Sequence, residues 1–120
     1  MNQLGTELVG STTYKKLFRS TLGPEDIVPC VVPGGVAASF LMGYAMIDDA
    51  STGHKKRYTN GGATTGACIL MQDLTSTVAG GNQTGNACRD GSVDSSMVID
   101  ISGSAVDATF KAALPKVSFD

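Results

Sequence analysis

The sequence predicts a small, mainly β domain, either a β-barrel or a sandwich, with one short C-terminal helix and an extended N-terminal arm. The chain has 120 residues, which is enough for one domain with a single modest core. Gly accounts for 15 of these residues, well above the usual ~7%, and so indicates many turns and short strands. Hydrophobic residues make up 42% and Trp is absent, so the core must consist of aliphatic residues, Met, Phe and Tyr.

The N-terminal region predicts an extended arm. Gly, Ser and Thr are scattered through residues 1–25 without a sustained period, and Gly23-Pro24 is a breaker pair. One helical turn is expected over residues 13–19. Pro29 and Pro33 restrict residues 27–32 to an edge strand or an extended connector. We therefore assign residues 1–35 to the arm and 36–120 to the β domain, and expect deletion of residues 1–25 to leave stability nearly unchanged.

Residues 36–47 predict the first buried strand, and it is apolar on both faces. Leu41, Ala45 and Ile47 share one face. A strand of this kind must be covered on both sides, and a chain this small is expected to use a second copy for one of them. The residues predicted at this interface between copies are Phe40, Met42, Tyr44 and Met46.

The middle of the chain predicts a turn, a hairpin and a second buried strand. Residues 48–53, Asp-Asp-Ala-Ser-Thr-Gly, form a turn in which carboxylates accept backbone hydrogen bonds. A short strand follows at residues 55–59, with Tyr58 directed inward. Asn60-Gly61 is a strong two-residue hairpin signal, and residues 67–74 predict the next buried strand.

The C-terminal part predicts further strands and the single helix. Strands at residues 86–89 and 92–95 are expected to form a hairpin through Asp90-Gly91, and residues 97–101 alternate as a strand does. Residues 104–107 have the form of a capping box, and Val106, Phe110 and Leu114 follow at helical spacing. Pro115 ends this helix, so residues 117–119 can return as a terminal strand.

The reactive side chains do not predict an active site. His54, the only histidine, is expected on an exposed loop beside three cations. The three Cys lack a Cys-x-x-Cys spacing, so free thiols are expected, although a nucleophilic Cys88 activated by Arg89 stays an alternative. The Asp residues of the turns could in principle share calcium, but such residues usually bind local backbone amides. We expect no enzyme activity, no cofactor and no metal.

Charge and hydropathy argue against nucleic-acid and membrane partners. The formal net charge is −2 and the pI is near 5.2, which gives no electrostatic footprint for nucleic acid. The N-terminus lacks the pattern of a signal peptide, and no stretch approaches the ~18 apolar residues of a membrane span. The protein is therefore expected to be made in the cytoplasm.

Residues 43–74, GYAMIDDASTGHKKRYTNGGATTGACILMQDL, carry a resemblance to a known family. A strand leads into an Asp-rich turn, a basic segment with Tyr follows, and a Gly-Ala-Cys-Ile-Leu strand closes the stretch. This pattern resembles the head decoration (capsid cement) proteins of tailed phages, the lambda head decoration type. The resemblance extends loosely over residues 36–120.

The resemblance implies a structural protein of the virion. Members of that family have a compact β-tulip-like domain and form homotrimers. The trimers bind the outer surface of the expanded capsid at three-fold and quasi-three-fold positions and stabilise the head against internal DNA pressure. The expected partners are the major capsid protein and the chain itself. The arm would bind the capsid through Tyr14, Lys15, Lys16, Leu17, Phe18 and Arg19.

A second function class stays open. The chain could be a binding module on the virion surface, for example one that recognises carbohydrate, without a cementing role. Such a module usually presents an aromatic platform, and a chain with no Trp and 3 Tyr is poorly suited to build one.

Overall fold

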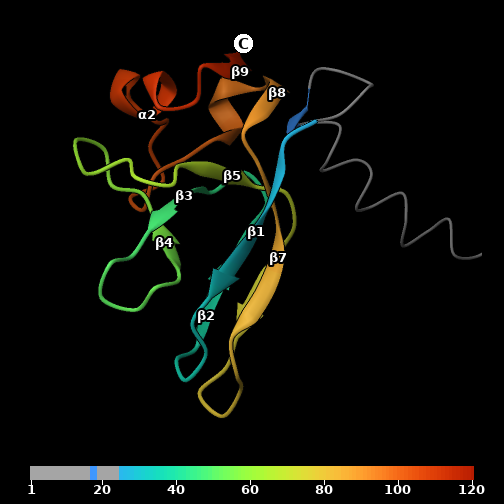
Figure 1. Ribbon diagram of the computed structural model, residues 1–120, viewed down its shortest axis with the longest axis vertical. Helices are drawn as coiled ribbons and strands as arrows, with labels where there is room; N and C mark the ends of the chain where they lie inside the picture. The colour runs from blue at the N-terminus through green and yellow to red at the C-terminus, as the bar shows by residue number, and fades with distance from the viewer. Residues whose placement is uncertain (1–16, 19–24) are drawn as a thin grey trace, which may run out of the picture.

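The mainly β fold with one short C-terminal helix is confirmed. The computed structural model describes residues 17–18 and 25–120 (Figure 1). Its elements, in chain order, are β1 Ile27–Val32, β2 Ala38–Phe40, β3 Ala45–Asp48, β4 Lys55–Arg57, β5 Cys68–Leu70, β6 Leu74–Ser76, β7 Gln83–Cys88, β8 Asp90–Val93, the 3-10 helix η1 Ser95–Met97, α2 Ala108–Ala112 and β9 Lys116–Phe119.

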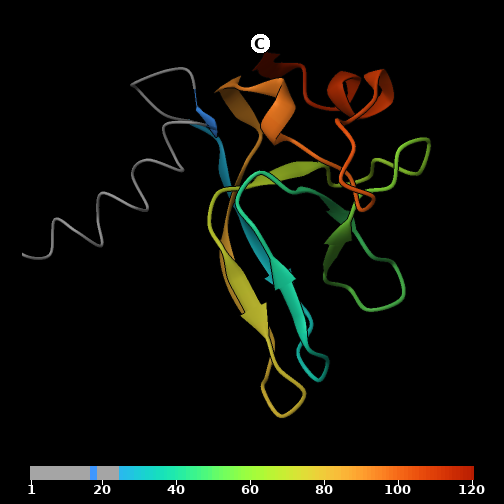
Figure 2. The same cartoon turned by 180° about the vertical axis from the view of Figure 1, so that it is seen from behind.

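Five strands form the main sheet, in the order β1-β7-β5-β3-β4, and all neighbours are antiparallel. Two further ladders flank it, the antiparallel pair β2-β6 and the parallel pair β8-β9. In Figure 1, α2, β8 and β9 lie at one end of the molecule, while β1, β2 and β7 extend toward the other. Figure 2 shows the β2-β6 ladder lying over the β1-β7 ladder.

The central strands separate two apolar cores. Ala45 and Ile47 of β3 contribute to the core beneath α2. Met46, which lies between them, contributes to a second core between the main sheet and the β2-β6 ladder. In β5, Ile69 faces the first core and its neighbour Leu70 faces the second. Alternation along each strand therefore sends adjacent apolar residues to opposite faces, and one chain covers both.

This arrangement corrects the reason for placing an interface on residues 36–47. Met46 is fully buried within one chain, so it is unavailable to a second copy. Phe40 and Tyr44 are partly buried against the same core as Met46, and Met42 is partly buried against the other. The apolar character of both faces is thus explained without a partner.

The expected single strand over residues 36–47 is wrong, because a turn divides it into β2 and β3. The amide of Tyr44 donates to the carbonyl of Leu41 at 3.1 Å, and Gly43 has a φ of 96°. A side chain at Gly43 would also overlap with the carbonyl of Met97. Glycine permits both the positive φ and this close approach, so the chain can leave the β2-β6 ladder and enter the main sheet.

Both predicted two-residue hairpins are also wrong. Asn60-Gly61 lies between β4 and β5, but these strands do not pair, because β3 lies between them. Asp90-Gly91 lies inside β8, which pairs with β9 and not with β7. A local dipeptide signal predicts a turn, whereas pairing in this sheet depends on strands that are distant in the sequence. The predicted strand over 67–74 is likewise divided into β5 and β6.

The boundary between arm and domain lies earlier than residue 36. Residues 27–32 form the edge strand β1, as the prolines predict, and all six pair with β7. Leu17 and Phe18 also belong to the domain, since both are buried in the core beneath α2 and Phe18 bridges Val93. Deletion of residues 1–25 would therefore remove core side chains, contrary to the expectation from sequence.

The C-terminal end combines η1, α2 and β9. Asp107 is the N-cap of α2, its Oδ1 accepting from the amide of Phe110 at 3.1 Å, so the cap lies three residues later than the start of the predicted capping box. The predicted strand over 97–101 is wrong, because η1 and isolated bridges at Ile99 occupy that region. The expected terminal strand is confirmed as β9, paired with β8.

Candidate functional site

One end of the molecule is a protrusion, which we define as residues 27–40 and 74–88. It contains β1, β2, β6 and β7 together with the loops at 33–37 and 77–82, which lie at its tip (Figure 1). Within these two ranges the chain has no Asp, Glu, Lys, Arg or His. The protrusion therefore carries none of the 9 basic and 11 acidic residues of the chain.

The two tip loops are held together through their backbones. The amide of Gly35 donates to the carbonyl of Thr77 at 3.1 Å, and the amide of Gly34 donates to Oδ1 of Asn82 at 3.1 Å. A Cβ on Gly34 would overlap with the carbonyls of Gly80 and Gly81. Close approach of the loops depends on glycine at this position, and the second loop continues directly into β7.

Exposed aliphatic side chains occur on this tip and near its base. Val78 is 72% exposed and Val36 is 53% exposed, one on each tip loop, and Leu41 just beyond β2 is 44% exposed. Single exposed aliphatic residues are ordinary, but two on interlocked loops of an uncharged protrusion mark a candidate contact surface.

The opposite end, which we call the capped end, comprises residues 58–62 and 94–120. Its carboxylates bind backbone amides of neighbouring turns. Asp94 Oδ1 accepts from the amide of Ser96 at 3.0 Å, and Asp107 Oδ2 accepts from the amide of Gly61 at 2.7 Å. Asp94 and Asp107 therefore have a structural role, because they hold the turns of this end in place.

Asp100 is the most enclosed of these carboxylates, at 3% exposure. It accepts from the hydroxyl of Ser102 at 2.7 Å, from the amide of Asn60 at 3.1 Å and from the amide of Ser104 at 3.1 Å. These donors, the Ser102 hydroxyl first, lower the pKa of Asp100 to about 2. Asp100 therefore stays ionised at neutral pH and ties residue 60 to residues 102–104.

Asp107 makes a second link between the same two segments. Its Oδ1 accepts from the hydroxyl of Tyr58 at 2.7 Å, and this hydrogen bond is the main cause of the lowered pKa of Asp107. The side chain of Asn60 donates to the carbonyl of Ala105 at 3.0 Å and accepts from the amide of Asp107 at 3.0 Å. The Tyr58 ring packs on Phe110 with centroids 4.8 Å apart, so this network closes directly over the core.

Arg57 connects the capped end with the main sheet. Its guanidinium carbon lies 3.6 Å from the centroid of the Tyr44 ring, and its Nη2 donates to the carbonyl of Asp100 at 2.7 Å. Tyr44, expected at an interface between copies, is thus covered on its ring by a residue of its own chain.

The three thiols are free and buried. Cys30 hydrogen-bonds the Cys68 sulfur, and this bond together with burial raises the pKa of Cys30 far above its usual value. Burial raises the pKa of Cys88 to about 12. The alternative of a Cys88 nucleophile is disfavoured, because a buried thiol with this pKa is protonated at neutral pH. His54, expected to be exposed, is partly buried and contacts Asn82, with Nε2 and Nδ2 3.2 Å apart.

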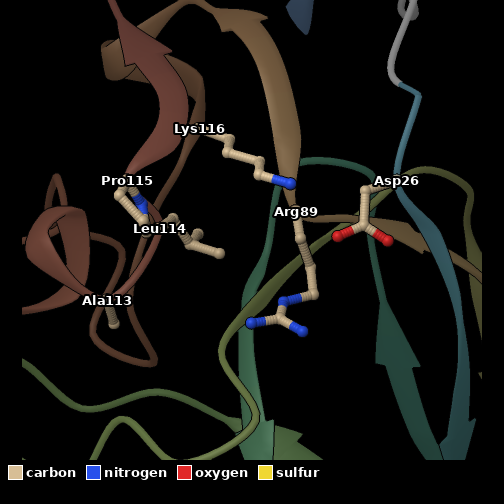
Figure 3. A pocket seen from close by; sticks show the side chains of 6 residues that line it. All are labelled: Asp26, Arg89, Ala113, Leu114, Pro115 and Lys116. Carbon is tan, nitrogen blue, oxygen red and sulfur yellow. The ribbon is translucent and has the colours of Figure 1, made fainter.

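A shallow hollow of about 180 Å³ lies where the β7–β8 junction meets the end of α2 (Figure 3). The amide of Arg89 donates to the carbonyl of Asp26 at 2.9 Å, which fixes this side of the hollow. The hollow is lined by one carboxylate, two cationic side chains and an apolar wall, and its lining includes no thiol or imidazole. The lining residues are Asp26, Arg89, Ala113, Leu114, Pro115 and Lys116.

The structure describes only part of the predicted site residues. Tyr14, Lys15, Lys16 and Arg19, predicted to bind the capsid, lie outside the described residues. Leu17 and Phe18 are buried in the core beneath α2, so they hold the chain to its own domain. The predicted interface residues Phe40, Met42 and Tyr44 are partly buried, and Met46 is fully buried.

Comparison with known proteins assigns no family, because no protein-family model matches the chain and no curated protein matches it. Within residues 17–18 and 25–120, no helix has the length and apolar character needed to cross a membrane. In the same described part of the chain, no three His, Cys, Asp or Glu side chains are grouped so that they could hold a metal ion.

Sequence reasoning missed the tip and the network of the capped end. The signal for the tip was the absence of charged residues from 27–47 and 74–88, a property that residues 58–72 share. The network had a weaker signal, because Asp100 and Asn60 are 40 residues apart and only the fold brings them into contact.

Proposed function

We propose that this protein is a structural component of a tailed-phage head that binds the outer surface of the expanded capsid as a homotrimer and stabilises it. The observation that carries the proposal is the use of the carboxylates. Asp49, Asp94, Asp100 and Asp107 each accept hydrogen bonds from backbone amides of turns and helix starts. Carboxylates that hydrogen-bond the backbone of their own chain are typical of a rigid structural protein, which is why this observation supports the proposal.

The sequence resemblance and the fold support the same function. The strand, acidic turn and Gly-Ala-Cys-Ile-Leu pattern of residues 43–74 resembles head decoration proteins, and the mainly β domain with one short helix agrees with what that resemblance implies. A ligand that binds only the expanded lattice stabilises that lattice by mass action. A trimer binds through three linked contacts, which raises its avidity above that of one contact.

The proposal includes a capsid-binding role for the arm, with fewer contact residues than the sequence predicted. Leu17 and Phe18 anchor the chain to the domain, so contact with the major capsid protein is proposed for Tyr14, Lys15, Lys16 and Arg19. Basic groups meeting acidic groups of the coat protein would make association salt-sensitive.

Co-sedimentation with cognate heads tests the proposal. The protein is expected to sediment with expanded heads and to stay in the supernatant with unexpanded heads. A chain that lacks residues 1–16 should keep its fold and bind expanded heads at least tenfold more weakly, ~1.4 kcal/mol. Equal binding by the two chains would contradict the role of the arm, and no binding of the full chain to either head would contradict the proposed function.

A further inference from the structure

We propose that Asn60 is a deamidation site that the native fold protects, so that the chain is modified there when the capped end opens and not while it stays closed. Asn60 is the only Asn of the chain that is followed by Gly. Deamidation of a flexible chain is fastest at Asn-Gly, because no side chain shields the glycine nitrogen. The hairpin predicted for this dipeptide does not form, and its contacts in the capped end instead control its reactivity.

The reaction needs two groups of the dipeptide to be free. The amide nitrogen of Gly61, after losing its proton to hydroxide, attacks Cγ of Asn60. The new N–Cγ bond closes a succinimide ring while the Cγ–Nδ2 bond breaks, and ammonia leaves with a proton taken from water. One water molecule then opens the ring to give aspartate or isoaspartate. Attack therefore requires an accessible Gly61 N–H and an Asn60 side chain that can rotate toward it.

The Gly61 N–H is engaged in the fold. It donates to Oδ2 of Asp107 at 2.7 Å and to the hydroxyl of Tyr58 at 3.3 Å. Removal of the proton would place an anionic nitrogen against the Asp107 carboxylate, and like charges at this distance repel. The hydrogen bond from Tyr58 lowers the pKa of Asp107, so this carboxylate is too weak a base to take the proton itself.

The side chain of Asn60 is held at both of its polar atoms. Its Nδ2 donates to the carbonyl of Ala105 at 3.0 Å, and its Oδ1 accepts from the amide of Asp107 at 3.0 Å. The backbone amide of Asn60 donates to Oδ2 of Asp100 at 3.1 Å. Rotation of the side chain toward Gly61 would break both side-chain hydrogen bonds, so the same network restrains the electrophile and the nucleophile.

The product of deamidation does not fit this network. Aspartate at position 60 would place an oxygen where Nδ2 now donates to the carbonyl of Ala105, and two acceptors would then face each other. It would also add a carboxylate between segments that already contain Asp100 and Asp107. A chain that opens and is modified at Asn60 therefore cannot rebuild the closed capped end, and local opening becomes irreversible.

Deamidation rates of the folded and the unfolded chain test the proposal. Both samples are incubated in mildly alkaline buffer, one without and one with denaturing urea, and peptide mapping by mass spectrometry follows Asn60. The folded chain is expected to react at least tenfold more slowly, because the reaction must wait for the capped end to open. Gly61→Ala is the control in urea, where its Cβ should slow the reaction. Equal rates in the folded and unfolded wild type would overturn the proposal.

Asp107→Asn tests whether the hydrogen bonds themselves protect Asn60. Asn is also a good N-cap, so α2 is retained, but its NH2 group would face the Gly61 N–H and remove that contact. Asn60 is expected to deamidate several-fold faster in this folded variant than in wild type. Asp94→Asn, at the N-cap of η1, is the matched control and should leave the rate unchanged. An unchanged or slower rate in Asp107→Asn would overturn the protective role of Asp107.

Asn60→Asp reproduces one product of the reaction and tests its consequence. At neutral pH this variant is expected to unfold at a lower urea concentration than wild type. The difference should narrow on acidification, as the new carboxylate is protonated. A urea midpoint equal to that of wild type at neutral pH would overturn the claim that modification makes opening irreversible.

Discussion

The protrusion and the capped end of this molecule are stabilised by different means. The capped end fixes its turns with side-chain carboxylates, as when Asp100 accepts from Asn60 and Ser104. The protrusion fixes its loops with glycine backbone contacts, as when Gly34 packs against Gly80 and Gly81. The turns of the capped end thus depend on charged side chains, whereas residues 27–40 and 74–88 contain none and expose the aliphatic side chains of Val36 and Val78.

The largest expected effect concerns Leu17, which is buried in the core beneath α2. Leu17→Ala is expected to lower the free energy of unfolding by about 2–5 kcal/mol, because it leaves a cavity in a fully buried site. Urea unfolding followed by circular dichroism measures this change. Leu41→Ala is the control, since Leu41 is 44% exposed and its change should be below about 1 kcal/mol. If both variants lost equally little free energy of unfolding, Leu17 would not be a core residue and would belong to the arm, as the sequence predicted.

The second prediction concerns the glycine contact of the protrusion. Gly34→Ala is expected to destabilise the fold by about 1–3 kcal/mol, because its Cβ would overlap with backbone carbonyls that cannot move aside easily. Gly81→Ala is the matched control, since nothing lies within 4 Å of a Cβ there. Thermal melting of both variants distinguishes them, and similar melting temperatures would show that the loops are not interlocked in solution.

The third prediction concerns the carboxylate network. The folded-state pKa of Asp100 is depressed to about 2, so its contribution to stability is present above the unfolded value of ~3.9 and is lost as pH falls toward 2. Asp100→Asn should therefore be less stable than wild type at pH 7, and the gap should narrow between pH 4 and pH 2. Urea midpoints across this range test it, and a gap that does not change with pH would assign the loss to packing.

The smallest expected effect concerns the ion pair of Lys55 and Asp48, whose Nζ and Oδ1 lie 2.6 Å apart. The Asp48 side chain is 51% exposed, so solvent screens the pair. Lys55→Gln is expected to lower the free energy of unfolding by less than about 1 kcal/mol, and the loss should shrink at high salt. A larger, salt-independent loss would assign the effect to the hydrogen bond that Lys55 donates to the carbonyl of Gly66.

Local patterns in the sequence were sufficient to predict the fold class, the edge strand at residues 27–32, the C-terminal helix region and the last strand. These features depend on glycine content, on proline placement, and on local periodicity and capping, which are properties of neighbouring residues. The arm contacts of Tyr14, Lys15, Lys16 and Arg19 stay predictions from sequence.

Strand pairing and the burial of particular residues became apparent from the folded chain and not from its sequence. The tertiary structure divided residues 36–47 at Gly43, placed β3 between β4 and β5, and moved Leu17 and Phe18 from the arm into the core. It also showed that the two apolar faces of β3 are covered by two different cores of the same chain. Pairing and burial depend on contacts between residues far apart in the sequence, and a dipeptide or a hydrophobic period carries no information about which distant segment will supply them.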